Sequence, residues 1–340
     1  MQRRPLSRAR VTGILLAASF AVLLTGALLF TNAIEWLGHR LNIAQGAVGS
    51  LLAAVATAMP ESLIPVVAII SAREGSGDVA VGAIIGAPFM LATIAMALVG
   101  ISAIVYRKRR TSGTGLAVHF PTLERDLTFF MVFFGAALGL GLFAPRWLQI
   151  VAAVVFIVAY GVYVQRTLVR GGAVQEEETL RPLIMDLDRG PQPPMKTILV
   201  QVAVSLGAII GGAHLFVHEL LEVAEHLGAD PLILALVLAP LATELPEKAN
   251  SFFWIREGKD TLALGNITGA MVFQSTLPVS LGLAFTDWEL TKFSVIAAGL
   301  GLAGGAVAIW ALQVQRRFSV PAILVWAGLF VAFVVVILLS

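Results

Sequence analysis

Ala56-Thr57-Ala58-Met59-Pro60-Glu61 and Ala242-Thr243-Glu244-Leu245-Pro246-Glu247 are two segments of nearly the same sequence, 186 residues apart. Each lies within an apolar stretch that is long enough to cross a bilayer. Proline has no N–H to continue a helix, and lipid strongly disfavours a buried carboxylate. Because both costs occur twice, at matching places, the two segments indicate a transport site inside the membrane.

The composition is that of a membrane protein. Of the 340 residues, 58% are hydrophobic and 13% are charged, with a mean hydropathy of +0.89. These values exclude an ordinary soluble domain and predict an all-α protein that crosses the membrane many times. The net charge of +2 is too small to indicate nucleic acid as a partner, and the absence of cysteine excludes disulfides.

The apolar stretches predict ten transmembrane helices. We expect them at residues 11–31, 46–72, 79–105, 127–143, 147–165, 197–217, 231–255, 261–285, 292–313 and 319–339. Four arginines precede the first stretch, as in a signal peptide. A similar stretch follows 186 residues later, near Thr197, so we expect the first stretch to be a retained span.

A polar segment divides the chain into two halves. Residues 166–196 have linker composition, with glycines, an acidic run and four prolines. We therefore expect a first five-helix repeat at 1–165, a linker at 166–196 and a second five-helix repeat at 197–340. Because each half has an odd number of spans, the second half inserts upside down, which makes an inverted-topology repeat.

The distribution of Lys and Arg predicts the orientation. One set of loops carries fifteen of these residues, including those of the linker, and the other set carries seven. The positive-inside rule then places the linker in the cytoplasm and both termini outside. We expect a multi-pass protein of the plasma (inner) membrane, with Trp147, Trp288 and Trp310 as anchors at its surfaces.

A second pair of matching segments follows the first pair. Gly82-Ala83-Ile84-Ile85-Gly86-Ala87 corresponds to Gly265-Asn266-Ile267-Thr268-Gly269-Ala270, at an offset of 183. The small-xxx-small spacing lets two helix backbones approach closely. Its recurrence in both halves predicts tight packing beside the Pro–Glu helices, although the spacing alone is common in ordinary helix packing.

The Pro–Glu segments carry oxygen ligands. Pro60 and Pro246 cannot bond to the carbonyl four residues earlier, which frees the carbonyls of Ala56 and Ala242. Each half also supplies a hydroxyl and a carboxylate close by, from Thr57 and Glu61 in the first half and from Thr243 and Glu247 in the second. Oxygen ligands without sulfur or imidazole favour a hard cation, and two glutamates neutralise a divalent ion. The alternative is a pair of proline kinks whose glutamates bond to neighbouring helices.

These segments resemble those of the calcium/cation antiporters, which include the sodium/calcium exchangers. That family carries Gly-Thr-Ser-x-Pro-Glu, followed by Gly-Asn-x-x-Gly-Ser-Asn-x-x-Asn/Asp, in each half. The resemblance covers essentially the whole chain and implies ten spans in two inverted repeats, with exchange of Ca²⁺ for Na⁺ or H⁺. By position it implies ion ligands at Thr57, Glu61, Thr243 and Glu247, with Asn266 and Gln274 as weaker ones.

Several hydroxyl positions of the family are occupied differently in this chain. Ala58 and Glu244 replace serines of the first element, Ala87 and Ala270 replace serines of the second, and Leu91 stands at its polar closing position. The family's sodium sites draw on those hydroxyls, so the counter-ion stays open between Na⁺ and H⁺.

Glu244 has two interpretations. It lies three residues before Glu247, so the two like charges lie near one face of a helix and one carboxylate could exchange a proton for calcium. It also lies four residues before Lys248, in the favoured orientation for an ion pair. The two interpretations are compatible.

The predicted function is that of a secondary active antiporter that exports Ca²⁺ in exchange for Na⁺ or H⁺ by alternating access. Its partners would be inorganic cations and the lipid bilayer, with no cofactor and no nucleic acid; the oligomeric state stays open, a monomer included. The nearest alternative is a monovalent (Na⁺/K⁺) cation/proton antiporter of the same fold. An intramembrane enzyme is disfavoured, because we expect every aspartate in a loop or at the end of a span.

Overall fold

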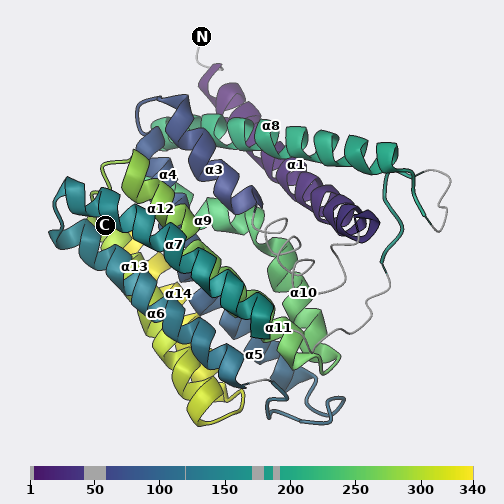
Figure 1. Ribbon diagram of the computed structural model, residues 1–340. Helices are drawn as coiled ribbons and strands as arrows, with labels where there is room; N and C mark the ends of the chain where they lie inside the picture. The colour runs from purple at the N-terminus through teal and green to yellow at the C-terminus, as the bar shows by residue number, and fades with distance from the viewer. Residues whose placement is uncertain (1–3, 42–58, 119, 171–179, 187–191, 340) are drawn as a thin grey trace.

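The computed structural model of the protein describes residues 4–41, 59–118, 120–170, 180–186 and 192–339. Within these ranges the regular secondary structure is helical, apart from one isolated bridge between Gly115 and Arg317 (Figure 1). The helices are α1 (Arg4–Arg40), α3 (Met59–Ser71), α4 (Ser76–Met90), α5 (Met96–Val105), α6 (Phe120–Phe143), α7 (Arg146–Arg170), α8 (Met195–Leu227), α9 (Pro231–Thr243), α10 (Leu245–Arg256), α11 (Asp260–Gln274), α12 (Leu277–Phe285), α13 (Lys292–Ala308) and α14 (Val320–Leu338). Two π-helical turns, η1 (Leu91–Ala95) and η2 (Ile309–Val314), continue α4 into α5 and extend α13.

The helices have the lengths that a membrane requires. Eight helical stretches in the described part of the chain are long and apolar enough to cross a bilayer. Two shorter apolar helices, Glu61–Ser71 and Pro231–Thr243, lie in the second and seventh predicted spans. The structure therefore confirms a helical protein with many apolar helices.

The sixth helix is longer than the sequence predicted. The predicted span ends at residue 217, whereas α8 continues to Leu227. In this polar extension Leu220, Leu221 and Ala224 are buried, at the spacing of one helix face. The helix ends where Gly228 adopts a left-handed conformation, with φ of 61°.

Helices α1 and α8 form a pair at one side of the molecule (Figure 1). A core that includes Leu23, Phe216 and Ile64 joins this pair to α3, α4 and α9. Part of the expected linker lies against the pair, because Asn32 Oδ1 accepts hydrogen bonds from Ile184 N and Gln201 Nε2, both at 3.0 Å. The segment 180–186 is therefore packed on α1 and α8.

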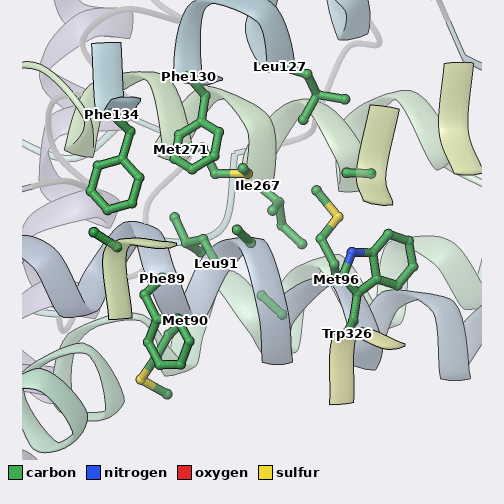
Figure 2. Packing of buried hydrophobic residues seen from close by; sticks show 14 of the residues in the cluster. Phe89, Met90, Leu91, Met96, Leu127, Phe130, Phe134, Ile267, Met271 and Trp326 are labelled. Atoms are coloured by element: carbon green, nitrogen blue, oxygen red, sulfur yellow. The ribbon is translucent and has the colours of Figure 1, made fainter. Parts of the chain in front are cut away.

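A larger core holds the other helices together. It contains residues of α4, α5, α6, α7, α11, α13 and α14, with Phe89, Phe130, Met271 and Trp326 among them (Figure 2). Helix α4 lies inside this assembly, since every residue from Val79 to Met90 is buried. In contrast, α7 exposes a run of apolar side chains, which is typical of a surface that faces lipid.

Trp288 corrects one prediction. Trp147 and Trp310 are exposed, as expected of surface anchors, but Trp288 is only 1% exposed. Its indole N–H donates to the carbonyl of Ala137 at 3.1 Å, and its ring lies against Gly282, where any side chain would collide with it. The position of Trp288 near the end of a span did not reveal that the chain turns its ring inward.

Candidate functional site

The seventh predicted span is broken in the middle. Helix α9 ends at Thr243 and α10 begins at Leu245, so Glu244 is the single residue between them. Pro246 has no N–H, and the carbonyl of Ala242 therefore lacks its ordinary helical donor. The break confirms the prediction for the second Pro–Glu segment. The corresponding part of the first half, up to residue 58, lies outside the described residues.

Glu244 is buried at this break and has two partners. Its Oε2 lies 2.6 Å from the Nζ of Lys248, one turn further along, and its Oε1 accepts a hydrogen bond of 3.2 Å from the Nε2 of Gln274. The three residues are 0%, 5% and 2% exposed. The ion pair that the sequence offered as one interpretation of Glu244 is therefore present, and Gln274 joins it from α11.

Thr243 and Ala242 lie beside Glu244 at the end of α9, and both are buried. The hydroxyl of Thr243 donates to the carbonyl of Ala239 at 3.1 Å. Its proton is used inside the helix, which leaves lone pairs of the hydroxyl oxygen as acceptors or ligands. The break thus gathers a carboxylate, a hydroxyl and a carbonyl without a helical donor.

The first half contributes Glu61, which is 7% exposed in the first turn of α3. Ala56 and Thr57 lie outside the described residues, as does the side chain of Glu247, whose backbone belongs to the first turn of α10. The expectation that Glu61 and Glu247 meet across the two halves therefore stays a prediction. Within the described part of the chain, no three His, Asp or Glu residues gather as a metal cluster.

Asn266 lies beside this region and bonds to α10. Its Nδ2 donates to the hydroxyl of Ser251 at 3.1 Å, which links α11 to α10. Asn266 is half-buried, whereas Gln274, two turns further along the same helix, is fully buried. Of the two residues predicted as weaker ligands, Gln274 is therefore the one that the structure brings to Glu244.

The glycine motif of the first half packs as predicted. A Cβ on Gly82 would lie 2.6 Å from the carbonyl oxygen of Leu232, and one on Gly86 would collide with the backbone of Leu236. Helices α4 and α9 therefore touch backbone to backbone. A Cβ added to Gly265 or Gly269 would meet no described atom within 4 Å. The segment of the first half that corresponds to the contact region of α9 falls within residues 42–58, which are outside the described residues.

Asp126 is a buried acid that the sequence did not reveal. It was expected at the end of a span, but α6 begins at Phe120, so Asp126 lies nearly two turns inside the helix and is 2% exposed. Its carboxylate accepts hydrogen bonds from Tyr163 (2.8 Å), Thr268 (3.0 Å) and Arg125 (3.0 Å). A charged residue just before a predicted span was the only signal, and such residues usually lie in loops.

The arrangement at the break suits a hard cation. The oxygens that the described residues offer belong to a carboxylate, a hydroxyl, an amide and a backbone carbonyl, and the ammonium of Lys248 pairs with the carboxylate. Such ligands are typical of calcium and sodium sites, and a broken helix is how membrane transporters expose backbone oxygens to an ion.

A family model and two curated relatives agree with this interpretation. The model described as "Sodium/calcium exchanger protein" matches residues 11–169 and 197–339. The "Putative antiporter CaxA" of Alkalimonas amylolytica is 24% identical over 274 residues, which are 80% of each chain. The "Sodium/calcium exchanger MaX1" of Methanosarcina acetivorans is 30% identical over 94 residues, which are 28% of this chain and 27% of that one.

Two solved structures have a similar fold. An H⁺/Ca²⁺ exchanger, CAX, superposes with a TM-score of 0.72 at 20% identity, over 96% of this chain and 82% of its own. The sodium-calcium exchanger NCX_Mj gives a TM-score of 0.60 at 17% identity, over 96% of this chain and 99% of its own. At these identities the likeness shows a shared helical membrane fold.

Proposed function

Because the chain belongs to the sodium/calcium exchanger protein family, we propose that it exports Ca²⁺ in exchange for Na⁺ or H⁺ as a secondary antiporter with alternating access. The family inferred from the Pro–Glu segments is the one that the family model identifies. Membership implies an integral, multi-pass membrane transporter of cations rather than an enzyme. The direction of calcium movement, the counter-ion and the plasma-membrane location are part of the proposal.

The observation that carries the proposal is the break between α9 and α10. A buried acid, a buried hydroxyl and a carbonyl without a helical donor meet there, at the end of the apolar helix α9. Non-helical backbone at membrane depth persists only where protein, water or a bound ion satisfies it. A transported cation is the occupant that this set of oxygens fits best.

The proposed ligands come from both halves. Glu61 and Glu247 would be the central ligands, one from each Pro–Glu segment, and the remaining ligands would surround them. These are the hydroxyls of Thr57 and Thr243, the carbonyls of Ala56 and Ala242, and the side chains of Asn266 and Gln274, with Glu244 beside them. The burial of Glu61, Thr243 and Gln274 supports this assignment.

The proposed layout is ten spans in two inverted repeats, at 1–165 and 197–340, with a cytoplasmic linker at 166–196. The family model supports it, because its two matched stretches leave out most of that linker. The helices support it as well, because α11 to α14 follow the same succession as α4 to α7, with a distortion where α4 and α11 end.

Neutralising the central ligands tests the proposal. We expect Glu61→Gln and Glu247→Gln each to reduce calcium flux in proteoliposomes to the level of empty vesicles, because a neutral amide cannot balance the charge of a desolvated divalent ion. Glu289→Gln, at an exposed loop position, is the matched control and should keep the flux. Calcium flux that persists in both site variants, with the protein folded, would refute the assignment.

Separate gradients identify the counter-ion and the cargo. Calcium flux should be driven by an imposed Na⁺ gradient or by an imposed pH gradient, each applied alone. Sodium or potassium flux that requires a pH gradient and ignores calcium would instead support the monovalent cation/proton antiporter.

A further inference from the structure

The ion pair at the break places a positive charge inside the candidate cation site. The Nζ of Lys248 lies 2.6 Å from the Oε2 of Glu244, and the two side chains are 5% and 1% exposed. The whole lysine is therefore within the protein, one turn into α10. The ammonium group is therefore a cation that belongs to the chain itself and is bound by a carboxylate.

The surroundings of the ammonium resemble a small cation site. The other oxygen of Glu244 accepts a hydrogen bond from Gln274 Nε2, so α11 fixes the orientation of the carboxylate. The Oε1 of Gln274 is buried and has no hydrogen-bond partner among the described residues. That oxygen therefore makes no hydrogen bond to the ammonium of Lys248, which is bound by the carboxylate of Glu244. Carboxylate oxygens are hard ligands of the kind that a metal cation takes.

The first half of the repeat has different residues at the matching positions. At the matching offsets the first half has Ala58 for Glu244, Ser62 for Lys248 and Leu91 for Gln274. All three polar residues occur together in one half, and none of them occurs in the other. A buried ion pair is seldom the most stabilising solution, since apolar residues of similar volume often stabilise as well or better. A role at the ion site, beyond holding the helices together, would account for such a set.

The charges agree with one divalent ion. The carboxylates of Glu61, Glu244 and Glu247 and the ammonium of Lys248 give a formal charge of −2. Calcium alone balances this charge. Without Lys248 the charge would be −3, which a divalent ion and one monovalent ion would balance together.

We propose that the carboxylate of Glu244, oriented by Gln274, forms a monovalent-cation subsite, and that the ammonium of Lys248 occupies it as a tethered cation. Lys248 thereby excludes Na⁺ from this subsite and determines how many counter-ions the exchanger binds. The inference rests on the proposed function, because the site in question is the one assigned to the transported ions.

Removing the tethered cation should create a sodium site. In Lys248→Met the ammonium is replaced by an apolar group of similar length, which leaves Glu244 and Gln274 in place. We expect the Tm of the purified variant, without calcium, to rise by about 2 °C or more for each tenfold increase in NaCl concentration, because a bound ligand stabilises the folded state. The rise is measured relative to choline chloride at the same ionic strength. The parent protein should lack this additional sodium dependence.

Two controls isolate the subsite. Lys259→Met makes the same change in an exposed lysine, which pairs with Glu257 at 3.4 Å, and should not gain sodium dependence. The double variant Glu244→Ala/Lys248→Ser installs the residues of the first half and removes both charges. This variant should not gain sodium dependence either. Folded Lys248→Met protein could also be obtained only when it is purified in sodium rather than choline. That requirement is the same gain of sodium dependence, observed through folding instead of Tm.

The outcomes separate this inference from the proposed function. A folded Lys248→Met protein whose stability responds equally to sodium and choline would overturn the inference, as would a variant that sodium does not rescue. Calcium stabilisation and calcium flux of the parent protein test the proposed function independently. A parent protein that ignores calcium, with a Lys248→Met variant that gains a sodium response, would leave the subsite standing and refute calcium exchange.

Discussion

Asp126 joins three helices through a single carboxylate. Tyr163 comes from α7 and Thr268 from α11, and both donate to the acid on α6. Thr268 is fully buried and lies within the glycine motif of the second half, two residues after Asn266. Asp126 therefore connects the outer helices to the helix that brings Gln274 to the candidate site.

Removing the hydroxyl of Thr268 tests this connection. We expect Thr268→Val to lower the free energy of unfolding by about 1–3 kcal/mol, because a buried carboxylate oxygen loses its donor. The Tm in detergent measures the effect. Thr167→Val is the matched control, since the hydroxyl of Thr167 bonds to the carbonyl of Tyr163 in its own helix. Equal losses in the two variants would contradict a special role for the Asp126 cluster.

At the scale of elements, the contact between α4 and α9 depends on two glycines. Gly86 lies against the backbone of Leu236 and Gly82 against that of Leu232, with no room for a side chain at either place. This contact holds the broken helix of the second half against the buried helix of the first half. This contact therefore fixes where the break, which Pro246 causes, lies relative to α4.

Adding one methyl group to this contact should push the two helices apart. We expect Gly86→Ala to destabilise the protein by about 1–3 kcal/mol, the usual effect of overpacking, and to reduce calcium flux. Gly211→Ala on α8 is the control, because no atom lies within 4 Å of the added Cβ. The Tm and the calcium flux of the two variants measure the two effects. A Gly86→Ala protein as stable as the control would show that the helices are not in close contact.

The two halves also distort their central helices at matching places. Helix α4 passes into the π-turn η1 at Leu91, shortly after Pro88, and α11 ends at the equivalent residue, Gln274. Helix α12 begins only at Leu277, with Pro278 in its first turn. A departure from α-helical bonding at the same point of each half supports the repeat, and in the second half Gln274, the last residue of α11, donates to Glu244.

At the scale of the whole molecule, the inverted repeat predicts that equivalent loops lie on opposite sides of the membrane. Glu74 follows α3 and Glu257 follows α10, and both are exposed. Because the chain contains no cysteine, a single introduced cysteine is the only thiol that a reagent finds.

Labelling of intact cells with a membrane-impermeant maleimide tests this topology. We expect Glu74→Cys to react from outside and Glu257→Cys to react only after the membrane is permeabilised, in keeping with the distribution of Lys and Arg. The opposite result would keep the inverted repeat and reverse its orientation. Reaction of both residues from the same side would rule out an inverted repeat.

Much of the fold could be predicted from the sequence, because the causes are local. A stretch of about twenty apolar residues forms a membrane helix whatever its neighbours are, and Pro246 breaks its helix because it has no N–H. The two Pro–Glu segments and the family they indicate were readable for the same reason. The pairing of Glu244 with Lys248 was one of two local alternatives, since the residues lie one turn apart.

The tertiary structure decided which residues from distant parts of the chain meet. Gln274 reaches Glu244 across 30 residues, Asp126 gathers partners from α7 and α11, and the ring of Trp288 turns into the core. Hydropathy tells that a helix is in the membrane, but in an apolar chain every face looks alike, so it does not tell which face meets another helix. Those contacts depend on the shapes of whole helices packed together, and only the packed molecule contains that information.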